Sequence, residues 1–314
     1  MKKKFLFPAN LTILLLLSVR AMAEVNGGGM AGAYMQLSWS ARAAGMGGAS
    51  VAVADDAEAG LFNPAGTMLL KGRHATASYR KMDLDRKLSF VSYAQGLKEG
   101  DAGLALSWIN VGVSDLDERD ANGELTGDIK YNENLITLSF GKRFAQKVLL
   151  GVNLKYDHSN LANVSANGLG FDFGFLWGEN TPYRIGLAAY NIGLSHQWSS
   201  GDYYVNRGSS GSNTTDKFPI SVKLGGSYRF YQNKVLLALD FEKREKQDLL
   251  IRAGAEGWVN QYLALRAGYN RNVVTFGAGI KVKWQKVTMV INYAFNAGSE
   301  GLDPDNLLSV AAVF

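Results

Sequence analysis

Residues 42–66 of this 314-residue chain read RAAGMGGASVAVADDAEAGLFNPAG and stand apart from the rest of the sequence. The stretch is rich in Gly and Ala, contains the adjacent acidic pair Asp55-Asp56, and ends on Asn63-Pro64-Ala65-Gly66. From about His74 onward the sequence becomes a series of segments in which apolar and polar residues alternate. A compact, non-repeating segment ahead of a long repetitive sheet predicts an N-terminal plug in the interior of a closed sheet.

The first residues have the pattern of a secretory signal peptide. Lys2, Lys3 and Lys4 form a positive n-region, residues 11–19 form an apolar h-region, and Ala21-Met22-Ala23 supplies the small-x-small cleavage pattern. We expect residues 1–23 to be removed, so that the mature chain starts near Glu24. The 33 basic residues then fall to 29 against 28 acidic ones, and the net charge falls from +5 to +1. The basic character therefore gives no indication of nucleic-acid binding.

Composition narrows the fold class further. The chain has no cysteine, which excludes disulfides, thiolate nucleophiles and thiolate metal sites. No later stretch approaches the roughly 18 consecutive apolar residues of a transmembrane helix. Aromatic residues make up 11% of an exported chain that has 36 Gly and only 5 Pro. These features, with alternation over strand-length segments, predict an all-β outer-membrane barrel.

The alternation separates two faces. In residues 148–157 one face carries Val, Leu, Val, Leu and Tyr, and the other carries Leu, Gly, Asn, Lys and Asp. Residues 169–177 and 220–230 repeat this contrast between an apolar, aromatic face and a small or charged one. A soluble sandwich would turn the apolar face inward, whereas a membrane barrel turns it toward lipid.

Strand number and spacing favour the membrane barrel. Gly, Asn, Asp and Pro clusters divide the chain into fourteen segments, most of them about ten residues long, as tilted membrane strands are. The predicted strands are 74–82, 87–95, 102–111, 131–144, 147–158, 168–178, 183–193, 218–230, 233–243, 248–257, 260–270, 272–283, 286–296 and 305–314. Connections after even-numbered strands are mostly tight, whereas every long connection, at 112–130, 159–167, 194–217 and 297–304, follows an odd-numbered strand. Short turns on one rim and longer loops on the other are typical of outer-membrane barrels.

The end of the chain agrees with this architecture. Leu308, Val310, Ala312 and Phe314 alternate up to a terminal aromatic residue, and we interpret Phe314 as a signal for the barrel-assembly machinery. Aromatic residues near the ends of several predicted strands are placed to form girdles at the lipid interface: Tyr93, Trp108, Tyr156, Trp177, Tyr269, Trp284 and Tyr293.

With these features in place, the opening stretch resembles the N-terminal hatch of the FadL-type long-chain fatty-acid transporter superfamily, and most closely its PorV/PorQ branch. Three blocks in order carry the resemblance. They are Arg42-Ala43-Ala44-Gly45-Met46-Gly47-Gly48-Ala49, then Ala52-Val53-Ala54-Asp55-Asp56, then Asn63-Pro64-Ala65-Gly66. The resemblance implies a fourteen-stranded antiparallel transmembrane β-barrel over residues 73–314 with a hatch, residues 24–72, in its lumen.

The resemblance also implies two functions and their partners. PorV-like proteins pair with the translocon of the type IX secretion system and pass its cargo to a surface attachment complex, so protein secretion or surface presentation is our first hypothesis. Uptake of fatty acids or other hydrophobic small molecules is the alternative. The longest predicted outward loop, residues 194–217, is polar rather than an apolar capture surface, which favours the first. Outer-membrane lipids are expected around the barrel.

Each hatch motif also has an alternative chemical interpretation. Gly45-Met46-Gly47-Gly48 lacks the Lys-Ser/Thr of a P-loop, so its glycines are expected to let the backbone turn and approach the wall. Asp55, Asp56 and Glu58 do not form the alternating ligand set of a calcium loop, and Arg42 is the candidate partner of the acidic pair. Asn63-Pro64 is a turn signal, and its place after the acidic pair suggests that it shapes a passage or gate. No metal or other cofactor is predicted.

Alternation also places charges of both signs in the lumen: Lys155, Asp157, Asp172, Arg184, Lys223, Asp240, Glu242, Arg252, Glu256, Arg266 and Lys281. We expect them to form an ion-pair network that holds the hatch, and a polar conductive path is the alternative. Catalysis is not predicted, because His74, His158 and His196 lie in unrelated segments and no triad-like signature occurs. Gly103, Gly151, Gly174 and Gly277 each permit a strand kink.

Overall fold

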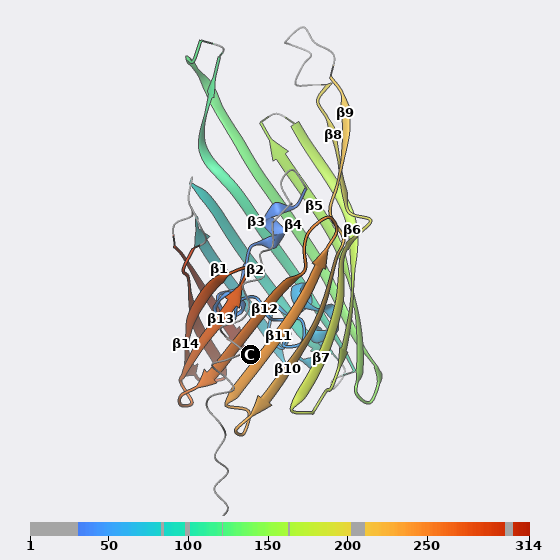
Figure 1. Ribbon diagram of the computed structural model, residues 1–314, viewed down its shortest axis with the longest axis vertical. Coiled ribbons are helices and arrows are strands. Elements are labelled where there is room, and N and C mark those ends of the chain that lie inside the picture. Colours follow the sequence, from blue (N-terminus) through green and yellow to red (C-terminus); the bar gives the residue numbers. More distant parts are fainter. Residues whose placement is uncertain are drawn as a thin grey trace, which may run out of the picture.

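The computed structural model describes residues 31–82, 85–97, 101–120, 122–162, 164–201, 211–298 and 304–314. Fourteen antiparallel strands in these ranges close into one barrel (Figure 1). Each strand pairs with the next, except that β7 pairs with β10, and the barrel closes where β1 pairs with β16. The predicted fourteen-stranded barrel is therefore confirmed. The predicted signal peptide, residues 1–23, and the first residues of the predicted hatch lie outside the described residues.

The barrel strands overlap the fourteen predicted segments one by one. They are β1 (Arg73–Lys81), β2 (Arg86–Leu97), β3 (Ala102–Arg119), β4 (Leu125–Ala145), β5 (Val148–Leu161), β6 (Val164–Trp177), β7 (Tyr183–Ile192), β10 (Ser221–Phe230), β11 (Val235–Arg244), β12 (Leu250–Trp258), β13 (Leu263–Asn270), β14 (Val273–Trp284), β15 (Val287–Asn296) and β16 (Asp305–Val313). The short turns lie at the end of the barrel where β1 begins and β16 ends, which is the periplasmic end of such barrels.

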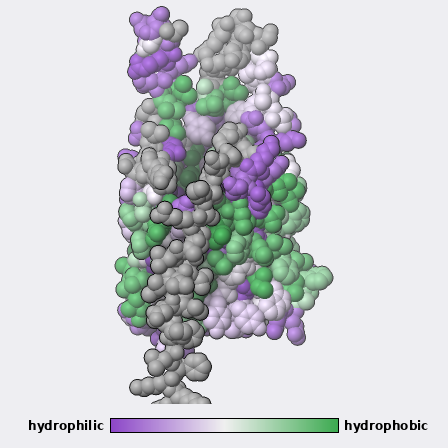
Figure 2. All heavy atoms as spheres, in the orientation of Figure 1, coloured by the Kyte–Doolittle hydropathy of each residue, from purple (hydrophilic) through white to green (hydrophobic). Residues whose placement is uncertain are grey.

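The two faces of the wall are oriented as alternation predicts. On β6 the outward Leu169, Phe171 and Phe173 are exposed, while the inward Asp172 is completely buried. Apolar side chains cover much of the lower wall in Figure 2, and polar ones gather at the projecting upper end. An apolar outer wall around a closed sheet defines an outer-membrane β-barrel, because closure satisfies every strand edge where lipid offers no hydrogen bonds. Among the described residues, no helix is long and apolar enough to cross a membrane.

The extracellular side differs from the prediction in two places. The expected loop at 112–130 is largely strand, because β3 and β4 continue to pair beyond a bulge as far as Arg119 opposite Leu125, and this hairpin projects above the barrel (Figure 1). The expected loop at 159–167 is likewise mostly strand, with Leu161 opposite Val164. Polar residues occupy both faces of these extensions, so the apolar alternation that marks a membrane strand is absent there. Within 194–217, a separate hairpin pairs β8 (Ser195–Ser199) with β9 (Asn213–Lys217).

Candidate functional site

The described part of the hatch, residues 31–72, lies inside the barrel and contains four short helices. These are η1 (Ala33–Gln36), α2 (Ala41–Gly45), α3 (Ala59–Phe62) and η2 (Pro64–Leu69). Residues 45–51 follow the inner wall from β14 to β7, and residues 63–70 follow it from β6 to β2. We call these segments the first arc and the second arc. Together they line most of the barrel's inner circumference.

A belt of inward-facing glycines lets the arcs lie directly against the wall. A Cβ added at any of them would lie within 3.1 Å of a hatch atom. The belt is formed by ten residues from ten strands: Gly96, Gly103, Gly141, Gly151, Gly174, Gly186, Gly225, Gly254, Gly268 and Gly277. The closest approaches to the hatch backbone are at Gly103 and Gly268, where the added Cβ would be 2.0 Å from the Thr67 carbonyl oxygen and from the Gly47 nitrogen, respectively. The glycines that could have kinked a strand, including Gly103, Gly151, Gly174 and Gly277, thus make room for the hatch.

The glycines of the first arc behave as predicted. Gly47 and Gly48 have positive φ values of 64° and 77°, which favour glycine, and they turn the chain at the wall. Gly45 faces Gly277 of β14. The structure therefore gives the Gly45-Met46-Gly47-Gly48 block a packing role at these positions.

Residues 54–58 connect the arcs by crossing the lumen, and we call them the chord. At one end Asp55 pairs with Arg229 of β10, and at the other Glu58 accepts a hydrogen bond from Thr76 of β1. In the ring of fourteen strands β10 and β1 are diametrically opposite. The acidic pair that stands out in the sequence therefore lies across the centre of the barrel.

Arg42 holds the chord in place. Its Nη1 donates to Asp55 Oδ1 at 2.8 Å and to Asp56 Oδ2 at 2.9 Å, which confirms the predicted pairing. The other side of the same guanidinium group, Nε and Nη2, forms two hydrogen bonds of 2.9 Å with Glu256 of β12. Arg266 donates to the same carboxylate at 2.8 Å. One arginine thus links the chord to the barrel wall.

The environment separates the charge states of two chord carboxyls. Burial favours the neutral form of Asp55, but Arg42, Arg229 and Arg184 outweigh it and hold the pKa of Asp55 well below its ordinary value. Burial, reinforced by the charge of Asp56, raises the pKa of Glu58 to about 8. Glu58 is 4% exposed and its Oε2 has no hydrogen-bond partner among the described residues. At neutral pH the chord therefore contains a charged, paired carboxylate and a protonated, buried one.

The Asn63-Pro64 turn fixes the second arc. Asn63 is completely buried, and its Nδ2 donates to the carbonyl oxygens of Val51 in the first arc and Phe175 in β6, both at 2.9 Å. Its Oδ1 accepts from the Ala65 N–H at 3.1 Å, and Pro64 begins η2. A Cβ at Gly66 would lie 2.3 Å from the carbonyl oxygen of Ala54. The motif Asn63-Pro64-Ala65-Gly66 therefore connects both arcs, the chord and the wall.

Most of the remaining lumenal charges form the predicted ion-pair network, but Lys281 has no carboxylate within ion-pair distance among the described residues and lies over the Trp258 ring instead. Glu242 on β11 is completely buried and is contacted by Arg244, Arg252 and, at 3.7 Å, Lys223. Lys155 pairs with Asp172 at 2.9 Å. Asp240 accepts the backbone N–H groups of Ser50 and Val51 in the first arc. Among the described residues, no group of three or more His, Asp and Glu side chains has a geometry that could hold a metal ion.

The inner wall above the hatch is apolar on one side. Five inward-facing residues of β2, β3 and β4 form a cluster that η1 covers with Tyr34: Leu88, Phe90, Ile109, Val111 and Leu135. Met35, Leu37 and Trp39 pack against this cluster, and Trp39 stacks on Phe62 with ring centroids 6.1 Å apart. We call the five wall residues the apolar sector. The sequence signal for it is the loss of alternation in β2–β4, where apolar residues occupy both faces.

A second contact missed by sequence reasoning holds η1 over this sector. The Tyr34 hydroxyl donates to Asp157 of β5, whose other oxygen lies 2.7 Å from Nε2 of His196 in β8. Tyr34, Asp157 and His196 are all buried. These residues are far apart in the chain, so only the fold brings them together.

Cavities lie on both sides of the hatch. The upper one, of about 50 Å³, is bordered by Trp39, Phe62, Tyr190 and Lys155. The lower one, of about 340 Å³, lies beneath the chord and is bordered by Arg42, Asp55, Glu58 and the inward-facing residues of β15 and β16. The chord therefore forms the upper boundary of a periplasmic vestibule.

Solved structures share this architecture. The toluene transporter TbuX of Ralstonia pickettii is 15% identical, with a TM-score of 0.60 over 86% of this chain and 96% of that one. The CymD monoaromatic hydrocarbon channel is 13% identical, with a TM-score of 0.62 over 87% and 96%. A FadL homologue of Pseudomonas aeruginosa is 11% identical, with a TM-score of 0.59 over 87% and 97%. No protein-family model matches the chain, and no curated protein matches it.

The fold and the lumenal segment together define a class: a bacterial outer-membrane barrel whose lumen is occupied by its own N-terminal hatch. Within that class, the solved neighbours identify the fold as that of the FadL-like fourteen-stranded barrels.

Proposed function

We propose that the protein is a FadL-type channel for hydrophobic small molecules. The observation that carries this proposal is the apolar sector above the hatch, formed by Leu88, Phe90, Ile109, Val111 and Leu135. A water-filled pore has a polar interior, whereas a buried apolar wall favours an apolar ligand. Two solved neighbours, a toluene transporter and a monoaromatic hydrocarbon channel, support the same substrate class.

In this proposal the structure is a closed state. A cavity of about 150 Å³ is needed for a ligand of benzene size, and the upper cavity has about 50 Å³. Tyr34 and Met35 of η1 cover the apolar sector that a ligand would contact. Ligand entry therefore requires η1 to leave the sector, which breaks the bond between Tyr34 and Asp157.

Passage to the periplasm requires a second movement. The glycine belt and Asn63 fix both arcs to the wall, so the chord is the part of the hatch whose displacement opens the centre of the lumen. The chord is held mainly by charged contacts, of Arg42 with Asp55 and Asp56 and of Arg229 with Asp55. We propose that a ligand moves from the apolar sector to the vestibule when the Arg42 contacts separate.

Uptake and site protection test this function together. Deleting the gene should lower the uptake of radiolabelled toluene or of a labelled long-chain fatty acid. Because the chain has no cysteine, Val111→Cys introduces a single thiol in the apolar sector, and its alkylation should slow when toluene is present. A cysteine in place of Thr214, which is exposed on β9, is the matched control and should react at the same rate with and without toluene. Unchanged uptake of both probes, together with unprotected Val111→Cys, would reject the proposal.

Protein secretion of the PorV/PorQ type is the second candidate. It is supported by the hatch motif and by the hairpin that projects above the barrel (Figure 1), where residues 113–130 contain six acidic and two basic residues. Such a surface suits contact with a basic face of a translocon or attachment-complex protein. Affinity purification of the tagged barrel should then recover such a partner, and a barrel lacking residues 114–128 should not. Normal secretion in the deletion strain would exclude this role.

A further inference from the structure

The periplasmic rim has a deep step on one side. The last backbone bond between β14 and the β12–β13 turn joins the Lys281 N–H to the Tyr262 carbonyl oxygen, yet β14 continues to Trp284. The three extra residues correspond to a step of roughly 10 Å at the usual rise of a strand. The β10–β11 turn forms the opposite side of the step, because the Trp258 N–H bonds to the Lys234 carbonyl oxygen.

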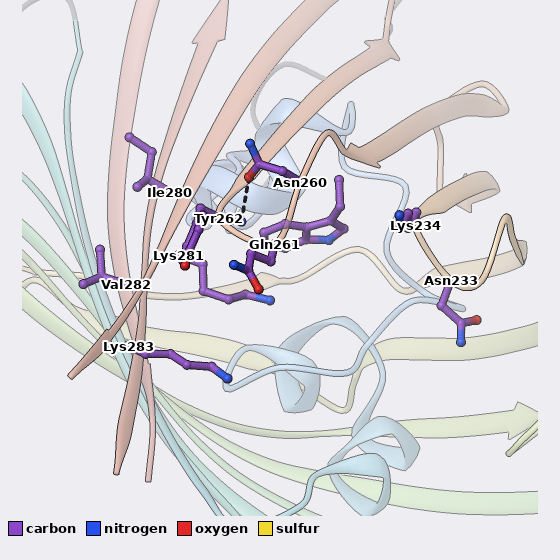
Figure 3. Close-up of a pocket in the computed structure, with 10 residues that line it drawn as sticks. Asn233, Lys234, Asn260, Gln261, Tyr262, Ile280, Lys281, Val282 and Lys283 are labelled. Carbon is purple, nitrogen blue, oxygen red and sulfur yellow. Dashed lines mark hydrogen bonds between the residues drawn. The ribbon is translucent and has the colours of Figure 1, made fainter. Parts of the chain in front are cut away.

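This step encloses a cavity of about 870 Å³, which we call the rim notch. Lys281 and Lys283 reach into it from β14, and Lys234 and Asn233 border its far side (Figure 3). The β12–β13 turn supplies its floor. Trp258 and Lys281 line both the rim notch and the vestibule. The notch therefore connects the lumen with the rim.

The cations of the rim notch have no ion-pair partner in the part of the chain that the structure describes. Among the described residues, Lys234, Lys281 and Lys283 have no carboxylate within ion-pair distance. Lys281 instead lies over the Trp258 ring, with its Nζ 3.9 Å from the ring centroid. This arrangement contrasts with the carboxylates of the neighbouring lumen, which are held by arginines. Three lysines around one cavity form a site that is complementary to an anionic oxygen group.

The surroundings of the notch indicate where the anion comes from. Ile280 and Val282 border the notch, and they are 53% and 45% exposed on the lipid side of β14. Tyr262 and Trp284 are exposed at the same rim, and such aromatic residues mark the level of lipid headgroups. A ligand in the notch can therefore place a phosphate among the lysines and an acyl chain along the outer wall.

We infer that the rim notch binds the headgroup phosphate of an anionic phospholipid from the periplasmic leaflet. Lys281 and Lys283 contact the phosphate, Lys234 closes the far side, and the Trp258 ring holds Lys281 in position. The site is independent of the proposed transport function, because it lies outside the hatch and the apolar sector.

Native mass spectrometry of the purified barrel in detergent tests this inference. The probes are phosphatidylglycerol, zwitterionic phosphatidylethanolamine and inorganic phosphate. We expect one phosphatidylglycerol per barrel in preference to phosphatidylethanolamine, with at least about tenfold weaker binding in the double variant Lys281→Gln/Lys283→Gln. Lys286→Gln, which removes a charge from the adjacent turn outside the notch, should bind as the unmodified protein does.

Three results decide the outcome. Restored binding in Lys281→Arg/Lys283→Arg would show that charge, rather than altered folding, explains the loss, and gel mobility with and without heating confirms that each variant folds. Equal binding in the double Gln variant and the unmodified protein would overturn the inference. Phosphate binding that does not depend on an acyl chain would replace the lipid with a free anion and also overturn it.

Discussion

Arg42 and Glu256 meet through two parallel hydrogen bonds of 2.9 Å, and the third nitrogen of the same guanidinium group holds both Asp55 and Asp56. A planar fork of donors makes this possible, whereas a lysine is a single point charge. The contact joins the wall of the barrel to the chord across its lumen.

Arg42→Gln should open the chord. Loss of the guanidinium leaves Glu256, Asp55 and Asp56 with fewer partners, at a cost on the order of 3 kcal/mol. We expect larger and more frequent openings in planar-bilayer conductance recordings. Arg42→Lys should give an intermediate effect, because it keeps the charge and loses the fork. Arg119→Gln, in the exposed extracellular hairpin, serves as the control. Equal conductance in Arg42→Gln and Arg119→Gln would show that the Arg42 contacts do not keep the chord closed.

Gly103→Ala should loosen the second arc. The added Cβ would lie 2.0 Å from the Thr67 carbonyl oxygen, so the backbone of the hatch has to move, at a cost of about 1–3 kcal/mol. Hydrogen exchange at residues 64–70 should become faster. Gly257→Ala is a matched change on β12 with nothing within 4 Å of the new Cβ, and it should leave exchange unchanged. Slow exchange in both variants would show that the belt does not hold the hatch.

Glu58→Gln should remove a pH dependence of hatch stability. The pKa of Glu58 is raised from 4.5 to about 8, so the folded state keeps a proton that the unfolded chain loses between these values. Stability then falls by up to about 1.4 kcal/mol per pH unit as the pH rises through this window. The amide in Glu58→Gln cannot ionise, so the hatch should gain stability at pH 7–9 and show a flatter profile. Hydrogen exchange of residues 54–62 at pH 5, 7 and 9, corrected for the intrinsic rate, measures this. Parallel profiles for the variant and the unmodified protein would refute it.

Tyr34→Phe should expose the apolar sector more often. It removes the hydrogen bond to Asp157, which is worth about 1 kcal/mol. The ratio of closed to open molecules should therefore fall roughly fivefold. The rate of alkylation at Val111→Cys reports this opening. Tyr131→Phe also removes a tyrosine hydroxyl, one that bonds to Glu133 outside η1, and it should leave the rate unchanged. A Tyr34→Phe rate equal to that of Tyr131→Phe would show that the Tyr34–Asp157 hydrogen bond does not hold η1 over the apolar sector.

Phe314→Ala should lower the amount of barrel in the outer membrane without unfolding the protein that arrives there. The ring is 58% exposed, and the backbone contact of Phe314, its N–H bonded to the Arg73 carbonyl oxygen, does not depend on the side chain. Quantitative immunoblotting of membrane fractions and heat-modifiability on gels separate assembly from stability. If the amount of Phe314→Ala in the outer membrane is normal, Phe314 is not needed as an assembly signal.

The sequence predicted the barrel wall because the bilayer imposes a repeating constraint on it. Segments such as β6 must face lipid on one side, so their alternation is visible without any knowledge of partners. The extensions of β3 and β5 above the membrane escaped prediction, because water on both faces removes that constraint. Their pairing depends on the ladder of backbone hydrogen bonds, which leaves no pattern in the side chains.

Within the site, local motifs were predictable and long-range contacts mostly were not. The pairing of Arg42 with the acidic pair follows from charges thirteen and fourteen residues apart. Glu256, which completes the cluster, lies 214 residues from Arg42 and was expected only to face the lumen. Gly103 was interpreted as a possible kink, because its partner in the hatch cannot be identified from either sequence segment alone. No sequence pattern indicates the role of Tyr34 or His196, since each is defined by one hydrogen bond to Asp157, which is distant in the chain.

The path of the hatch constrains how this protein is assembled. Helix α2, near the start of the described chain, packs against β13–β16, whereas η2 packs against β2–β6. Helix α2 therefore has no wall to rest on until the last strands are in place, and the loop that its docking closes spans most of the chain. Sealing of the β1–β16 seam and docking of α2 are therefore expected to be parts of one late event. The lumen is therefore expected to be filled as the barrel closes, rather than after closure.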